Sequence, residues 1–345
     1  MKAATLESKF PLLAVENGCI VSKEADVTVA FRVELPELFS VTGSEYEAVH
    51  SAWHKAVKVL PEYSIVHKQD FFIEEKYRPE TDRDDLSFLS RSFERHFNER
   101  PFLNHFCYLF LTKTTKARSR QESTFSTLCK GRLVPKEIED RETVTRFIEA
   151  VGQFEKIMND SGLVTLRRLT TDEITGTERS AGIVEKYLSL SQHDTTVLKD
   201  IQLNPEEMRI GDDILCLHTL SDTEDLPGKV ATDSRYERLS TDRSDCRLSF
   251  AAPVGLLLDC NHCYNQYIFI DDHGENLKRF EQTARNMHSL SRYSRSNQIN
   301  KAWIEEYLNE AHSKGLTSVR CHCNVMAWSD DREELRRIKN EVGSQ

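Results

Sequence analysis

The sequence lacks any long run of apolar residues. Its longest apolar stretch, FAAPVGLLL at 250–258, is about half as long as a membrane-spanning helix and contains Pro253 and Gly255. The amino-terminal stretch MKAATLESKFPLLAV places Glu7 and Lys9 where a signal peptide needs an uninterrupted apolar core. We therefore expect no transmembrane segment and no export signal, and we expect a cytoplasmic protein.

The motifs of several common enzyme classes are also absent. The sequence contains no G-x-S-x-G, no H-E-x-x-H and no G-x-G-x-x-G. A phosphate-binding loop needs G-x-x-x-x-G-K-[ST], but the single Gly-Lys pair, Gly228-Lys229, has Thr223 where the first glycine is required. We therefore expect no catalytic residue and no cofactor-binding residue in this chain.

Two aspartates after YIFI, Asp271 and Asp272, resemble the strand-plus-acid pattern that holds Mg²⁺ in nucleotide-hydrolysing motors. Mg²⁺ in such a site is held opposite a phosphate, and the sequence has no phosphate-binding loop. The simpler interpretation is that the pair ends a strand and begins a helix near Gly274, where negative charge suits the helix dipole.

The cysteine content argues against a disulfide framework, because nine is an odd number and no export signal accompanies it. Cys260, Cys263, Cys321 and Cys323 nevertheless offer the ligand types of a zinc site. Residues two apart on a strand are separated by about 6.6 Å, which is awkward for two thiolates on one ion. We expect these four thiols to be buried in the core. The alternative is a zinc-dependent nucleic-acid-binding or processing protein that uses all four.

Negative charge predominates, with 56 acidic against 46 basic residues and a net charge of -10. Such a chain repels a phosphate backbone unless its cations are gathered locally. One cluster exists in TKTTKARSRQ, at Lys113, Lys116, Arg118 and Arg120. A solvated loop is the favoured interpretation, and contact with nucleic acid or a protein partner is the alternative.

Periodicity in the first half predicts alternating strands and helices. DVTVAFRVEL (26–35) alternates as a half-buried strand and forms a hairpin with 18–22. Thr42 and Glu45 form a capping box for a helix that ends at Pro61. The other expected elements are strands at 63–75, 102–112 and 163–169, helices at 84–99 and 137–159, and a helix that starts at Thr170. In the helix at 84–99 we expect Leu86, Leu89, Phe93 and Phe97 to face inward.

The second half repeats this plan loosely. Its expected strands lie at 212–220, 246–259, 265–271 and 316–328, and its expected helices at 274–294, 298–314 and 330–342. A length of 345 residues suggests two domains, and the polar span 189–207 is the candidate boundary. We expect an α+β fold with two sub-domains, 1–192 and 206–345. Each is expected to be a mostly antiparallel sheet with helices on one face, in ferredoxin-like ββαβαβ order.

Four segments carry a family resemblance. They are FPLLAVENGCIVSKEADVTVAFRVELPELFSVT (10–42), SFLSRSFERHFNERPFLNHFCYLFLTKTT (87–115), FAAPVGLLLDCNHCYNQYIFIDD (250–272) and CNVMAWSDDREELRRIKNEV (323–342). They resemble the amino-terminal part of the TraG proteins of Bacteroidetes conjugative elements, within the family of conjugation and type IV secretion traffic ATPases.

The resemblance implies a module that precedes a RecA-like motor domain, which we expect to be absent from this chain. It implies docking on inner-membrane and cytoplasmic components of a conjugative secretion complex, and assembly as a homo-oligomer at the inner face of the inner membrane. ATP and Mg²⁺ are expected of the full-length family member. No catalytic residue is carried over, so we expect this chain to act through surfaces.

Overall fold

The computed structural model describes residues 10–37, 41–77, 87–115, 141–205, 207–220, 234–248, 251–290 and 294–344. The strands in these ranges are β1 Leu12–Glu16, β2 Cys19–Ser22, β3 Val27–Glu34, β4 Ser64–Lys76, β5 Pro101–Lys113, β6 Thr165–Arg168, β7 Ile201–Leu203, β8 Met208–Ile210, β9 Asp213–Thr219, β10 Ser234–Arg235, β11 Arg247–Leu248, β12 His262–Ile270 and β13 Arg320–Ser329. The helices are α2 Gly43–Val59, α3 Phe88–Asn98, α6 Arg141–Asn159, α7 Thr171–Thr175, α8 Ile183–Leu188, α9 Pro253–Leu256, α10 His273–Leu290, α11 Arg295–Lys314 and α12 Arg332–Ser344. The expected α+β class is confirmed.

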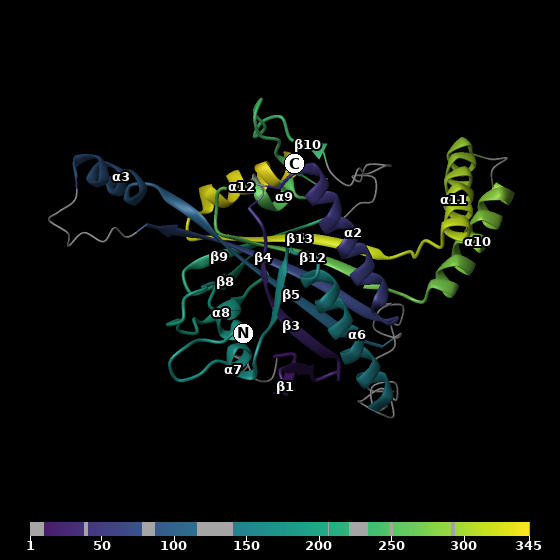
Figure 1. Cartoon of the computed structure of the whole chain (residues 1–345), viewed down its shortest axis with the longest axis horizontal. Coiled ribbons are helices and arrows are strands. Elements are labelled where there is room, and N and C mark those ends of the chain that lie inside the picture. Colours follow the sequence, from purple (N-terminus) through teal and green to yellow (C-terminus); the bar gives the residue numbers. More distant parts are fainter. Residues whose placement is uncertain are drawn as a thin grey trace.

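Strands from both halves of the chain form one large sheet, in the order β1-β2-β3-β5-β4-β12-β13-β9-β8-β7, with β6 beside β3 (Figure 1). The two halves meet where β12 pairs with β4, from Ile270 opposite Ser64 to His262 opposite Phe72. We expected a separate sheet in each half. The single sheet has a physical reason. Separate sheets would leave β4 and β12 each with an unpaired edge, and the pairing of the two strands satisfies both edges.

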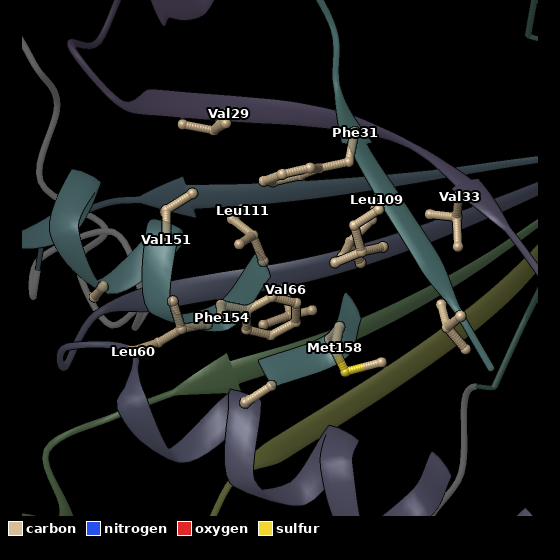
Figure 2. Close-up of a cluster of buried hydrophobic side chains, with 14 of the residues drawn as sticks. Val29, Phe31, Val33, Leu60, Val66, Leu109, Leu111, Val151, Phe154 and Met158 are labelled. Atoms are coloured by element: carbon tan, nitrogen blue, oxygen red, sulfur yellow. The ribbon is translucent and has the colours of Figure 1, made fainter. Parts of the chain in front are cut away.

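Three apolar clusters hold layers against this sheet. On one face, α2 and α6 cover β3, β5 and β4, where Phe154 and Met158 of α6 meet Phe31 and Leu109 of the strands (Figure 2). Trp53 of α2 packs edge-on against Phe154 with ring centroids 5.7 Å apart. Further along the same face, α9 and α12 cover β12 and β13.

The opposite face carries the third cluster. There α7 and α8 pack over β3, β5 and β4, with Ile174, Phe71 and Tyr108 among the buried residues. Helices therefore lie on both faces, whereas the sequence predicted one helical face. The two helices on this second face are short, with five and six residues, and their periodicity is correspondingly weak.

Local signals were largely reliable. Thr42 caps α2 and Thr170 caps α7, each in a capping box with a glutamate three residues later. The predicted strand at 246–259 is wrong, because among its described residues only Arg247–Leu248 is extended and α9 follows at Pro253.

Among the described residues, no helix combines the length and apolar character needed to cross a membrane.

Candidate interaction surface

The β4-β5 hairpin extends beyond the sheet as an arm. Neighbouring strands cover only part of it, because β12 pairs with β4 no further than Phe72 and β3 pairs with β5 no further than Cys107. The outer residues, from Ile73 to Lys76, pair only with β5, as far as Pro101. Helix α3 lies in the connection between the two strands and is carried away from the body of the protein (Figure 1).

The apolar face of α3 is exposed. The exposed fractions are 79% for Phe88, 76% for Leu89, 62% for Phe93 and 44% for Phe97. The prediction that Leu89, Phe93 and Phe97 face inward is therefore wrong, and Leu86 lies outside the described residues. The amphipathic pattern was identified correctly, but the arm removes the helix from the sheet that would have covered it.

Neighbouring aromatic residues enlarge this face. The rings of Phe93 and Phe97 lie 4.5 Å apart, and that of Tyr77 lies 6.5 Å from Phe97. Tyr77 and Phe102 are also exposed. We call the following set the tip surface: Tyr77, Phe88, Leu89, Phe93, Phe97 and Phe102. A clustered, exposed apolar surface of this kind is typical of an interaction site.

Positive charge borders the tip surface. Arg91 follows Phe88 by three residues and Arg95 follows Arg91 by four, so the two arginines share one side of α3, next to Phe88 and away from Phe93 and Phe97. Both residues are exposed. An apolar centre with a charged rim is the arrangement of protein–protein interfaces.

A second projection lies at the other end of the molecule. Helices α10 and α11 pack against each other as a hairpin between β12 and β13 (Figure 1). The rings of Phe280 and Tyr307 are in contact, with centroids 5.0 Å apart. Trp303 and Ile299 of α11 are 62% and 43% exposed. Glu306, one turn beyond Trp303, is exposed on the same side of the helix.

The base of this hairpin is held by the first of the two aspartates. Asp271 is 2% exposed and accepts hydrogen bonds from Arg320 Nε at 2.6 Å and Nη2 at 3.1 Å. Asp272 caps α10, because its Oδ1 accepts from the Glu275 amide at 2.9 Å. The interpretation of this pair as a strand end that leads into a helix is confirmed.

The four cysteines of the alternative zinc-site interpretation do not lie on one face of the sheet. In the pairing of β12 with β13, Cys323 lies opposite Gln266 and Cys321 opposite Ile268. Side chains alternate along β12, so Cys263 lies on the other face of the sheet from these two cysteines. Cys260 and Cys263 are buried as expected, and burial raises the pKa of Cys260 to about 12. The prediction is wrong for Cys321, which is exposed because β9 reaches only to Asn324 along β13.

The basic cluster falls mostly outside the described residues. Lys116, Arg118 and Arg120 all lie there, so their contact with nucleic acid or a partner stays a prediction. Lys113 is 7% exposed; its Nζ donates to the Glu62 carbonyl and lies 5.4 Å from the Tyr63 ring centroid.

A different polar cluster was missed by the sequence reasoning. Asp70 on β4 is 3% exposed and faces Cys107 across the strands, while His105 Nε2 lies 2.8 Å from its Oδ1. Asp70, His105 and Cys107 are the one metal-ligand-like group of three among the described residues. Lys68 Nζ also donates to Asp70, so the carboxylate already has a cationic partner. The alternation His105-x-Cys107 was visible in the sequence, but the register with Asp70 was not.

Comparison with known proteins gives one family match. Residues 1–51 match the family described as "Domain of unknown function, B. Theta Gene description (DUF3875)". This stretch contains β1, β2, β3 and the start of α2. No curated protein matches the chain significantly.

Proposed function

We propose that this chain is the amino-terminal docking and oligomerisation module of a conjugative-transfer ATPase of the type IV secretion family, and that it acts through surfaces rather than catalysis. The observation that carries the proposal is the tip surface, an apolar face held away from the body on a two-stranded arm. The resemblance to TraG proteins motivates it; the family matched over residues 1–51 is described by no activity.

The partner that best fits the tip surface is a second copy of this chain. Trp303 and Ile299 offer an apolar contact at the far end of the molecule, and Glu306 beside them complements Arg91 and Arg95. A contact between opposite ends is heterologous, so it builds a ring or an open chain of copies. Other copies and the inner-membrane and cytoplasmic components of the secretion complex are the proposed partners.

Sedimentation velocity over a range of concentrations tests this assembly. We expect the unmodified chain to associate and the Phe93→Ser, Phe97→Ser double variant to remain monomeric. Val197→Ser is the matched control, because Val197 is 81% exposed and lies far from α3 in the sequence, between α8 and β7. Equal association of the double variant and the control would contradict a role for the tip surface.

A charge exchange tests the choice of partner. Arg95→Glu and Glu306→Arg should each weaken association, and the combined variant should recover it. If neither single variant has an effect while the Phe93→Ser, Phe97→Ser variant is monomeric, the tip surface binds elsewhere on its partner.

Incubation with ATP and Mg²⁺ tests the non-catalytic part of the proposal. We expect no turnover, because these 345 residues contain no phosphate-binding loop. Robust hydrolysis that is abolished by changing Asp271 or Asp272 would contradict the proposal.

A further inference from the structure

A cavity of about 520 Å³ lies on the face of the sheet opposite α2 and α6. Its floor is formed by β5, β4 and β12, and its roof by α8 and the residues that lead into β1. This volume is within the range of sites for small organic ligands. The cavity lies over the part of the β4-β5 hairpin that belongs to the sheet, whereas the tip surface lies at the outer end of the same hairpin. The two sites share no residue, so ligand binding in the cavity can be tested separately from the proposed function.

A row of aromatic rings forms part of the floor. Phe110, His67 and Tyr267 are direct neighbours across β5, β4 and β12. The His67 and Tyr267 rings stack at 4.2 Å with 14° between their planes, and those of His67 and Phe110 at 5.3 Å with 29°. The three rings therefore stack face to face along the row, so their edges rather than their faces line the cavity. An aromatic ring edge carries partial positive charge and packs well against the negative face of another ring, so a row of edges suits a flat aromatic ligand.

A row of polar groups lies next to the rings. Gln69 Nε2 donates to Asn265 Oδ1 at 3.0 Å, and Asn265 Nδ2 donates to Asn324 Oδ1 at 3.0 Å. Above them, the Tyr108 hydroxyl donates to Gln192 Oε1 at 2.8 Å. Of these residues Gln69, Tyr108 and Gln192 line the cavity, and the bonds fix their side chains, so their remaining hydrogen-bonding capacity is preorganised toward a ligand.

His67 supplies an acceptor at this site. Its Nε2 lies 2.8 Å from Asn265 Oδ1, which already accepts from Gln69, so Nε2 carries the proton. Burial lowers the pKa of His67 to about 4, against the opposing effects of Asn265 and Asp70. The ring is therefore neutral near pH 7 and its Nδ1 is a hydrogen-bond acceptor.

Among the described residues, the lining contains no aspartate, glutamate, lysine or arginine side chain. A charged ligand would lose its hydration here without gaining a counter-charge, which is costly. We propose that this cavity is a binding site for an uncharged, planar aromatic molecule that lies with one face across the ring edges of Phe110, His67 and Tyr267 and donates a hydrogen bond to His67 Nδ1.

The probe N-phenyl-1-naphthylamine has this chemistry, because it is neutral and aromatic and carries one N–H donor. We expect its fluorescence to rise on titration with the full chain and to saturate at one probe per chain. Its sulfonated relative, 1-anilinonaphthalene-8-sulfonate, should bind about tenfold more weakly or worse at this site, because the lining offers its charge no partner.

Substitutions locate the binding. Val184→Trp fills the cavity from α8 and should reduce affinity at least about tenfold, whereas His67→Phe keeps a ring but removes the acceptor and should reduce it about two- to tenfold. Phe93→Ser is the control, because it removes an exposed aromatic side chain of the tip surface and should leave affinity unchanged. Circular dichroism of each variant confirms that it is folded.

Two results would overturn the proposal. One is probe binding that does not saturate or is absent. The other is binding that survives in folded Val184→Trp but is lost in Phe93→Ser, since the probe would then report the tip surface rather than the cavity.

Discussion

The ion pair between Asp271 and Arg320 gives a sharp test of the structure. The pair joins the residue that follows β12 to the first residue of β13, so it closes the base of the α10-α11 hairpin. Asp271→Asn keeps the size of the side chain and removes its charge. Asp272→Asn makes the same chemical change one residue later, at an N-cap that asparagine fills about as well as aspartate.

The structure sets the expected magnitudes. Breaking a fully buried ion pair costs about 3–5 kcal/mol. Asp271 is 2% exposed, but the Arg320 side chain is 48% exposed and can rehydrate, so we expect the lower value of about 2–3 kcal/mol for Asp271→Asn. Asp272→Asn should cost about 0.3–1 kcal/mol, because it loses only the interaction of a negative charge with the helix dipole.

Urea unfolding followed by circular dichroism measures both variants. Amide hydrogen exchange adds a local readout, because loss of the pair should speed exchange in the first turn of α10 and at the start of β13 more than in β5. Equal destabilisation by Asp271→Asn and Asp272→Asn, or unchanged exchange at the hairpin base, would refute the buried pair.

Three further predictions concern the core, a tight turn and acid stability. Phe154→Ala should lower the free energy of unfolding in urea by about 3–5 kcal/mol, because the side chain is fully buried. Phe93→Ala should change it by no more than about 0.5 kcal/mol, because that side chain is exposed. Equal losses would contradict the position of α3. Gly176→Ala should destabilise more than Gly162→Ala, since both have positive φ but only the first would place a Cβ 2.8 Å from a backbone nitrogen, that of Gly182; the urea midpoints of the two variants decide this. Burial alone would raise the pKa of Asp70, but Lys68 and His105 together hold it below its usual value. The stabilisation from Asp70 is therefore present above about pH 4 and lost as the pH falls further. If the free energy of unfolding depends on pH in the same way for Asp70→Asn and for the unmodified chain between pH 7 and pH 3, this prediction is wrong.

The sequence predicted local structure better than long-range arrangement. Capping boxes at Thr42 and Thr170 and the alternation in β3 are encoded within a few residues, and each was identified. The exposure of Phe93 and Phe97 depends on how far β4 and β5 extend past their neighbours, which no local pattern encodes. The cavity depends on the register of β5, β4 and β12, so the stacking of His67 on Tyr267 could not be predicted from either segment alone.

The pairing of β4 with β12 also has a consequence for biosynthesis. His67 and Tyr267 are partners across these strands, so one edge of β4 stays open until about 200 further residues have been translated. At about 5–20 residues per second this interval lasts roughly 10–40 s. An apolar strand edge exposed for so long invites pairing with other nascent chains, so we expect the yield of native protein to depend on chaperones that bind the first half of the chain during translation.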